Sequence, residues 1–241
     1  MNTSRAAVSF VTRWLRRLFA GLLALLVLYQ LWLLAWVVVW RWVDPGSTRF
    51  MEIRLAERRA DDLQTPQAWL KKHWVDYDGI SVHLKRAMIT AEDDRFTQHG
   101  GFDWNGIRNA IRNNQQRGRI VSGGSTISQQ LAKNLFLSPQ KTLWRKAEEA
   151  VITLMLENLW SKRRIFEVYL NVIEWGDGVF GAEAAARHYF GVGAARLTPA
   201  QAARLAGMVP RPRFFDRHRN TPGLAARAAT IQSRMPSARI P

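Results

Sequence analysis

Residues 123–135 read Gly-Gly-Ser-Thr-Ile-Ser-Gln-Gln-Leu-Ala-Lys-Asn-Leu, and this stretch decides the fold class. Two glycines interrupt the chain, and Ser125 or Thr126 then offers an oxygen that can cap a helix. Apolar residues follow at helical spacing, at Ile127, Leu131 and Leu135. The stretch therefore predicts a capped helix that begins at a glycine-rich loop.

The same helical spacing covers most of the chain beyond residue 80, and strand-like alternation is scarce. Asp103 is an expected N-cap, and Thr198 followed by Pro199 is a strong helix start. Further apolar stripes run over 84–91, 107–111, 143–159 and 165–172, and mobile glycine-rich connections are expected near 100, 118–124, 176–181 and 191–193. We expect a mainly α-helical domain in which the helix over 143–159 is long and deeply buried.

A charge-free run of 23 residues, Leu18–Trp40, lies near the N-terminus. Such a run can span a hydrocarbon core of about 30 Å as a helix. Four arginines precede it, and tryptophans gather at its C-terminal end, as in an interfacial belt. The alternative is a cleaved signal peptide, but no small-residue cleavage site follows the run. We expect an uncleaved transmembrane helix with the N-terminus in the cytoplasm and the rest of the chain in the periplasm.

The composition limits the partners and the chemistry. The chain has 241 residues, 35 Lys plus Arg against 19 Asp plus Glu, and no cysteine. A formal net charge of +16 favours an anionic partner or membrane surface, while the lack of cysteine excludes disulfides and thiolate metal sites. Residues 1–41 hold five arginines and no acid, so the remainder keeps a net charge of +11. The excess of positive charge therefore belongs to the part expected to be exported as well as to the arginines that flank the apolar run.

Four segments carry the candidate chemistry. The first places Glu92 and Asp93 at the end of an apolar helix, before a glycine-rich break; partial burial there could turn a carboxylate into a general base. The second is the 123–135 stretch, whose polar residues share one helix face. The third begins at Lys141 and mixes cations with a carboxylate, and the fourth surrounds Glu174 with glycines and aromatics. Taken singly, each segment is also compatible with a solvated helix end, a capped helix, a surface ion-pair cluster or a tight turn.

The order and spacing of these segments resemble glycosyltransferase family 51, the peptidoglycan glycosyltransferases. The likeness covers roughly residues 80–212, with Glu92-Asp93-x-x-Phe96-x-x-His99-x-Gly101 as its first motif and the 123–134 stretch as its second. Arg145-Lys146-x-x-Glu149 is similar to the third motif, 162–181 to the fourth and 205–212 to the fifth. The N-terminal anchor makes the chain most similar to the monofunctional members of the family. Asp94, Ser128 and Lys141 depart from the commoner residues of the motifs without removing a required group.

The resemblance implies a lysozyme-like helical glycosyltransferase domain with a flexible small lobe around 104–120, preceded by one transmembrane helix. We then expect a basic cytoplasmic N-terminus at 1–17, the membrane helix at 18–40, a linker leading into the domain at 41–79, the catalytic domain at 80–212 and a peripheral basic tail at 213–241. The expected location is the bacterial inner membrane, with the catalytic domain in the periplasm.

The resemblance also implies the reaction: transfer of a growing lipid-pyrophosphate-linked glycan to the 4-hydroxyl of lipid II, with inversion to a β-1,4 linkage. Glu92 matches the general base, and Glu149 matches a second catalytic carboxylate that orients cations or holds a metal. No cofactor is required, although a divalent Mg or Mn ion at Glu149 is one alternative. The residues expected to bind substrate are Asp93, Ser125, Gln129, Gln130, Lys133, Lys141, Arg145 and Lys146.

The implied partners are lipid II, the nascent glycan strand, the membrane and proteins of cell division or elongation, with no nucleic acid. Two other classes of function stay open. A glycan-cleaving enzyme on a similar fold would have no use for cations that bind pyrophosphate. A membrane-anchored basic binding module would leave the paired Glu and Gln residues unexplained.

Because Glu92 is followed by Asp93, Asp94 and Arg95, we expect a polar neighbourhood that keeps its carboxylate ionised.

Overall fold

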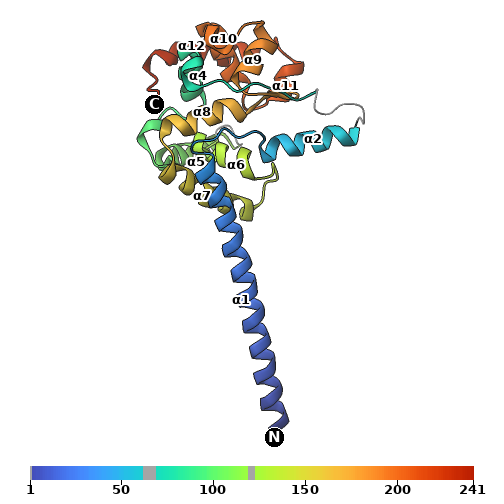
Figure 1. The fold of residues 1–241 in the computed structure, drawn as a ribbon. Coiled ribbons are helices and arrows are strands. Elements are labelled where there is room, and N and C mark those ends of the chain that lie inside the picture. The colour runs from blue at the N-terminus through green and yellow to red at the C-terminus, as the bar shows by residue number, and fades with distance from the viewer. Residues whose placement is uncertain (1, 62–68, 119–122) are drawn as a thin grey trace. The chain divides into compact units, whose positions relative to one another are not determined.

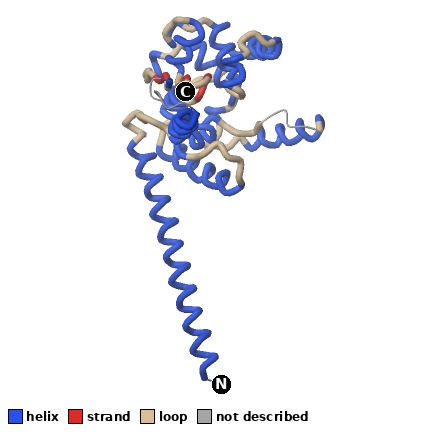
Figure 2. The backbone as a smooth tube through the Cα atoms, turned by 90° about the vertical axis from the view of Figure 1, so that its right-hand side faces the viewer, coloured by secondary structure: helices blue, strands red, loops and turns tan. Residues whose placement is uncertain are grey.

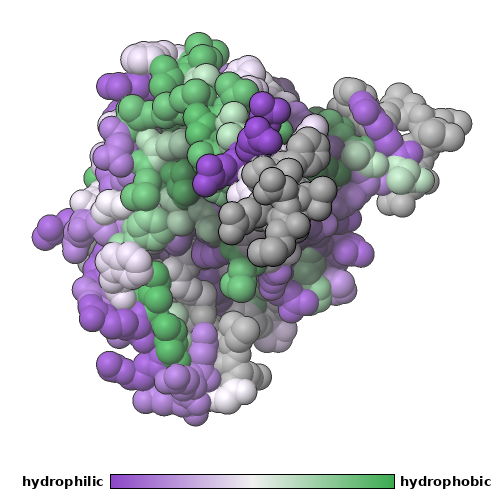
Figure 3. Space-filling view, turned by 90° about the horizontal axis from the view of Figure 1, so that it is seen from below, coloured by the Kyte–Doolittle hydropathy of each residue, from purple (hydrophilic) through white to green (hydrophobic). Residues whose placement is uncertain are grey.

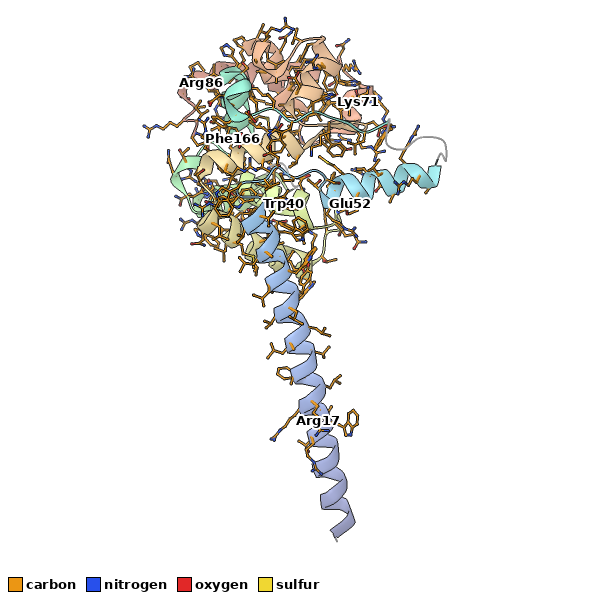
Figure 4. The ribbon with its side chains drawn as sticks, viewed as in Figure 1. Arg17, Trp40, Glu52, Lys71, Arg86 and Phe166 are labelled. Atoms are coloured by element: carbon orange, nitrogen blue, oxygen red, sulfur yellow. The ribbon has the colours of Figure 1, made fainter. Side chains whose placement is uncertain are left out.

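The computed structural model describes residues 2–61, 69–118 and 123–241, and the chain divides into two compact units, Met1–Val43 and Asp44–Pro241. The first unit is the single helix α1 (Asn2–Val39), on which Arg17 is labelled in Figure 4. Within α1, Thr12–Val39 is long and apolar enough to cross a membrane. The expected apolar helix is present, and it continues through the basic residues ahead of the charge-free run. Many apolar residues of α1 are exposed, and hydrophobic residues are drawn in green in Figure 3.

The second unit is built mainly from helices (Figures 1 and 2), as the sequence predicts. Its helices are α2 (Arg49–Asp61), α4 (Val82–Glu92), α5 (Trp104–Arg117), α6 (Ile127–Phe136), α7 (Leu143–Leu159), α8 (Lys162–Val172), α9 (Ala182–Phe190), α10 (Pro199–Met208), α11 (Pro212–Arg217) and α12 (Pro222–Arg234). Short 3-10 turns are η1 (Tyr77–Gly79), η2 (Phe96–Gln98), η3 (Ala194–Arg196) and η4 (Met235–Ser237). Residues 41–79, expected as a linker, thus contain a 13-residue helix, α2, that packs on α6.

The helix starts follow the capping chemistry of the sequence. Thr126 caps α6, and its Oγ1 accepts a hydrogen bond from the Gln129 backbone N–H at 3.2 Å. Thr198 caps α10 in the same way, with Pro199 in the first turn. The Asp103 side chain caps α5 by accepting from the Gly106 N–H at 2.9 Å. These caps satisfy N–H groups that have no partner inside their helix, which fixes where each helix begins.

Helix α8 lies at the centre of the core. Its Phe166, labelled in Figure 4, is fully buried and packs at a tilt against Phe96, whose ring centroid is 5.6 Å away. Tyr169 of α8 is also fully buried. Helix α6 packs against α7 and α8, while α10 packs against α4 and α12. The helix that carries the first motif and the helix that carries the second are therefore both fixed by buried neighbours.

A small three-stranded sheet forms where the sequence predicts no strands. β1 (Lys71–Lys72) runs parallel to β3 (Val179–Phe180), and β3 pairs antiparallel with β2 (Glu174–Gly176). The glycine-rich connection expected to be mobile at 176–181 is thus mostly buried. Gly181 has a φ of +84°, and a Cβ there would lie 2.7 Å from the Asn171 carbonyl oxygen, so glycine is required for this close approach. The connection expected at 118–124 lies partly outside the described residues.

The apolar stripe of α7 is exposed, whereas the sequence predicts that it is buried. Leu143 is 92% exposed and Leu154 is 49% exposed, whereas the buried residues of α7 are Glu149, Ile152, Thr153 and Leu156. The prediction of a deeply buried helix is wrong because α7 buries only one face, on which Glu149 and Thr153 lie beside Ile152 and Leu156. Periodicity locates an apolar face but does not say whether protein or another apolar medium covers it.

The C-terminal segment is part of the packed unit, and the expectation of a peripheral tail at 213–241 is wrong. Leu224 and Ile231 of α12 and Met235 of η4 are buried, and α12 packs against α10 and α4. Leu224 fits against Gly207 of α10, where a Cβ would lie 3.1 Å from Leu224 Cδ1. The arginines of this segment lie on the other faces of a helix whose apolar residues enter the core.

We predict that Leu224→Ala lowers the free energy of unfolding by about 2–5 kcal/mol, because it leaves a cavity beside α10. Gln232→Ala, at an exposed position of the same helix, should change it by about 0.5 kcal/mol or less. Urea unfolding of the full chain in detergent, followed by tryptophan fluorescence, measures both. Equal effects of the two substitutions would show that α12 is not packed as described.

Candidate active site

Glu92 is the last residue of α4, and its side chain is 11% exposed. Its Oε2 accepts a hydrogen bond from Gln130 Nε2 at 2.9 Å, and its Oε1 lies 3.6 Å from the guanidinium of Arg227. Oε1 is buried and accepts no hydrogen bond from the described residues. Burial raises the pKa of the Glu92 carboxyl, while Gln130, Arg227 and Lys133 oppose the rise. The expectation that the sequence neighbours of Glu92 keep its carboxylate ionised is therefore wrong: Asp94 is exposed, Glu92 turns into the protein, and the groups that favour the ionised form come from other helices.

Gln130 of α6 is held in one orientation by Tyr169 of α8. The phenol of Tyr169 donates to Gln130 Oε1 at 3.1 Å, which leaves the amide N–H₂ to face Glu92. Burial raises the pKa of the Tyr169 phenol well above its usual range, so it remains a donor. One oxygen of Glu92 is thereby fixed, and the other stays free for a proton donor.

Asp93 lies beside Glu92 but faces another direction. Its Oδ1 is 2.9 Å from His99 Nε2, and its Oδ2 accepts from the Ile127 backbone N–H at 3.1 Å. His99 Nδ1 accepts from the Gly101 N–H, so Nε2 carries the proton that faces Asp93. The Asp93 side chain is only 2% exposed. Its carboxylate ties the first motif to the start of α6, although Asp93 also lines the cavity beside Glu92, and its contact with substrate stays a prediction.

Gln129 is likewise a structural residue here. It is buried, and its Oε1 accepts from the Thr126 backbone N–H at 3.0 Å, completing the capping box of α6. The Gln129 side-chain oxygen is committed to the cap, so a contact of this residue with substrate, which stays a prediction, would have to use its amide N–H₂ group. The neighbouring Gln130 points to Glu92 instead.

Glu149 of α7 is the centre of a cation cluster. Its side chain is 4% exposed and accepts from Arg145 at 2.5 Å and from Lys146 at the other oxygen. Lys146 also donates to Ser125 Oγ at 3.4 Å, which joins the cluster to the glycine-rich loop. The structure thus brings together Ser125, Arg145, Lys146 and Glu149. Lys141 is exposed in the segment before α7, and no contact places it with them.

Lys133 of α6 lies between the two carboxylate centres. Within the described residues it forms no hydrogen bond or ion pair, and it is partly buried. Burial lowers the pKa of the Lys133 ammonium; Glu149 and Glu92 raise it, and Arg145 and Lys146 lower it further. A cation in this position, without an anionic contact, is a ready site for a negatively charged ligand.

Two cavities flank the pair of Glu92 and Gln130. The first has a volume of about 420 Å³ and is lined by Gln130 and Lys133 together with residues of α2 and 209–214. The second has a volume of about 400 Å³ and is lined by Glu92, the glycine-rich loop with Ser125, and the polar face of α5. The general-base candidate and its hydrogen-bond partner therefore border different cavities.

The residues do not form a protein-only metal site. Among the described residues, no group of three or more His, Cys, Asp or Glu side chains could hold a metal ion. Both oxygens of Glu149 already contact cations, Arg145 and Lys146, which disfavours a divalent ion beside them. This donor set does not fit the metal-ligand alternative for Glu149, and it favours cation orientation.

Three side-chain contacts in and around the site were not predicted from the sequence. Arg227 was assigned to a tail, although the i, i+7 spacing of Leu224 and Ile231 signals a helix with a buried face. Tyr169 lies within the apolar stripe over 165–172, and its contact with Gln130 depends on the packing of α6 on α8. Glu174 belongs to the fourth candidate segment, but its pairing with Arg54 of α2 had no sequence signal because 120 residues separate the two.

The family model and the relatives that match this chain agree on one family. Residues 59–236 match the family described as Transglycosylase. The chain is 64% identical to the biosynthetic peptidoglycan transglycosylase of Dechloromonas aromatica, over 95% of this chain and 98% of that protein. It is 56% identical to the protein of the same name from Chromobacterium violaceum, over 96% of this chain and 100% of that protein. The protein of that name from Laribacter hongkongensis is 58% identical, over 95% and 99% of the two chains.

The family match covers well over half of the chain, includes every motif residue of the site and reaches through α12. The relatives extend over nearly the whole chain, including α1 and α2. On this evidence, the chain belongs to the transglycosylase family.

Proposed function

We propose that this protein is a peptidoglycan glycosyltransferase that polymerises glycan chains from lipid II, with Glu92 as the general base. The observation that carries the proposal is the state of the Glu92 carboxylate. Gln130 fixes one of its oxygens, and the other accepts no hydrogen bond from the described residues. A base must have a free lone pair within reach of the proton that it removes.

The reaction is a single displacement. The 4-hydroxyl oxygen of lipid II forms a bond to the anomeric carbon of the growing chain as that carbon's bond to the pyrophosphate oxygen breaks. The hydroxyl proton goes to Glu92, and the electron pair of the broken bond leaves on the pyrophosphate. An α-linked donor gives a β-1,4 product because one displacement inverts the carbon. Burial raises the pKa of Glu92, and that makes its carboxylate a stronger base.

Cations, rather than a general acid, suit the leaving group. Pyrophosphate is stable as an anion, so its departure is favoured by fixed positive charge. Lys133 has no anionic contact in the described residues, and Arg145 and Lys146 are held in place by Glu149. Ser125 adds a hydroxyl beside Lys146. Lys141 is exposed in the segment before α7, and in this proposal it approaches the ligand from solvent. In this proposal Asp93 and Gln129 position the site.

The exposed apolar residues suit a lipid-linked substrate. On α5, Trp104 is 67% exposed, and on α7, Leu143 and Trp144 are 92% and 66% exposed. Apolar side chains that protein leaves uncovered mark contact with another apolar phase. In this proposal these helices contact the membrane surface or the lipid of the substrate, and the second unit is periplasmic.

We predict that Glu92→Gln lowers kcat by about 10²–10⁴-fold, because the amide keeps the shape of the side chain but cannot take the proton. Asp94→Asn changes the neighbouring exposed acid and should retain normal turnover. Polymer formed from labelled lipid II, measured alongside the melting temperature of each variant, checks this. Near-normal polymerisation by a folded Glu92→Gln protein would exclude Glu92 as the base.

We predict a shift in the acidic limb of the pH profile in Arg227→Ala. A base is active when ionised, so kcat/KM falls as the pH drops through the pKa of Glu92. Arg227 lowers that pKa, and its removal should therefore move the limb to higher pH. Arg234→Ala removes a guanidinium that pairs with Asp94 instead, and it should leave the limb in place. A limb that stays unmoved in Arg227→Ala would disconnect this pair from the titrating base.

The expected topology gives a third prediction. Four arginines ahead of the apolar run favour an N-terminus in the cytoplasm. A reporter that is active only in the periplasm should work when fused after Pro241 and fail when fused before Met1. The reverse pattern would overturn the orientation, and a shortened mature protein seen by mass spectrometry would support a signal peptide.

A further inference from the structure

Glu174 is a buried carboxylate that the proposed reaction does not use. It is the first residue of β2, its side chain is 5% exposed, and it lines the cavity that Lys133 also lines. Its Oε2 contacts Arg54, whereas its Oε1 is buried and accepts no hydrogen bond from the described residues. An unmatched buried acceptor is costly unless a ligand supplies the donor.

Arg54 of α2 holds Glu174 in place. The Arg54 Nε and one terminal nitrogen lie 3.3 and 3.2 Å from Glu174 Oε2, and the other terminal nitrogen donates to Glu57 at 2.7 Å. Burial raises the pKa of the Glu174 carboxyl, and the charge of Arg54 opposes the rise. The ion pair thus favours the carboxylate form, which can only accept hydrogen bonds.

The rest of the cavity is basic and aromatic. Arg211 forms no ion pair within the described part of the chain, and its guanidinium lies 4.4 Å from the ring centroid of Phe214. Lys133 likewise has no ion pair there, and Phe50 of α2 adds a second aromatic ring. A cavity of about 420 Å³ is far larger than a phosphate group needs. The lining therefore suits a ligand that joins an anion to a larger polar group with hydrogen-bond donors.

We propose that this cavity binds an acetamido-sugar phosphate portion of the lipid-linked substrate, in which Glu174 Oε1 accepts a hydrogen bond from a sugar N–H or O–H group. The assignment rests on the proposed function. Glu174 is then a specificity-determining residue, and Arg54 is the positioning residue that orients it. Lys133 and Arg211 provide positive charge for the phosphate. Gln130 lines the same cavity, which places the sugar next to the reacting centre.

The proposal is tested by pairing substitutions in the protein with changes in the substrate. The full chain is assayed with native lipid II and with two sets of analogues. In one set, the nitrogen of an acetamido group is replaced by oxygen; in the other, a sugar hydroxyl is replaced by hydrogen. The wild type should prefer native lipid II to at least one analogue by roughly 10- to 100-fold in kcat/KM, because a hydrogen bond to a charged acceptor is lost. In Glu174→Ala, that preference should fall to about one.

Further variants separate recognition from folding. Arg54→Ala should raise KM for native lipid II more than it lowers kcat, and Arg54→Lys should restore part of the loss. Arg49→Ala, in an exposed pair with Glu52 on the same helix, serves as the matched control and should behave as wild type. If Glu174→Ala fails to fold, Glu174→Gln replaces it, since the amide can donate as well as accept and should change the order of preference among the analogues.

The outcomes are distinct from those of the proposed function. Equal use of native lipid II and every analogue by the wild type, or an unchanged preference in the folded Glu174 variant, would overturn the role of Glu174 while polymerisation itself continues. Failure of the wild type to polymerise native lipid II would instead overturn the proposed function. Loss of preference for one analogue alone supports the proposal and identifies the sugar group that donates.

Discussion

The phenol of Tyr169 donates to the Gln130 carbonyl oxygen, and the Gln130 amide donates in turn to Glu92. This chain of two hydrogen bonds joins α8, α6 and α4, and it fixes the side chain that matters most to the proposed chemistry. A carboxamide can rotate and offer either its oxygen or its nitrogen. Because burial keeps the phenol protonated, only one orientation satisfies both neighbours. The core helix α8 therefore determines what the Glu92 carboxylate meets.

Adjacent residues of the motifs divide the work between support and chemistry. Glu92 presents a free oxygen, while Asp93 spends its oxygens on His99 and on the start of α6. Gln130 faces Glu92, while Gln129 closes the capping box. In each pair the supporting residue is nearly inaccessible, so its polar atoms must find partners within the protein. Reactive groups are held on rigid elements because their immediate neighbours in the sequence are anchored.

Much of the helical architecture was predictable because its signals are local. A cap such as Thr126 or Thr198, followed by apolar residues at helical spacing, specifies where a helix begins from a few consecutive residues. The burial of each face was not predictable in this way. Helix α7 exposes Leu143 and buries Glu149, and α12 enters the core despite its arginines. Which face is covered depends on partners far away in the sequence.

The site was predictable to a similar extent. The motif resemblance selected Glu92 and the cations, but it could not separate residues that touch a ligand from residues that hold the site together. Nor could it find Arg227, whose contact with Glu92 requires α12 to pack beside α4. The surroundings of the Glu92 carboxyl could not be predicted for the same reason. Its sequence neighbours are polar, yet the protein around the carboxyl is buried, and the surrounding structure sets a pKa.

The buried setting of Glu92 bears directly on the kind of chemistry that the site favours. A carboxyl with a raised pKa could serve as a general acid or as a general base, so burial alone does not separate glycan cleavage from synthesis. The neighbours do separate them. Gln130 donates to the carboxylate, and Arg227 and Lys133 add positive charge, all of which favour the ionised form. An acid that must deliver a proton to a sugar oxygen would gain from the opposite surroundings, whereas a base next to a departing pyrophosphate gains from these.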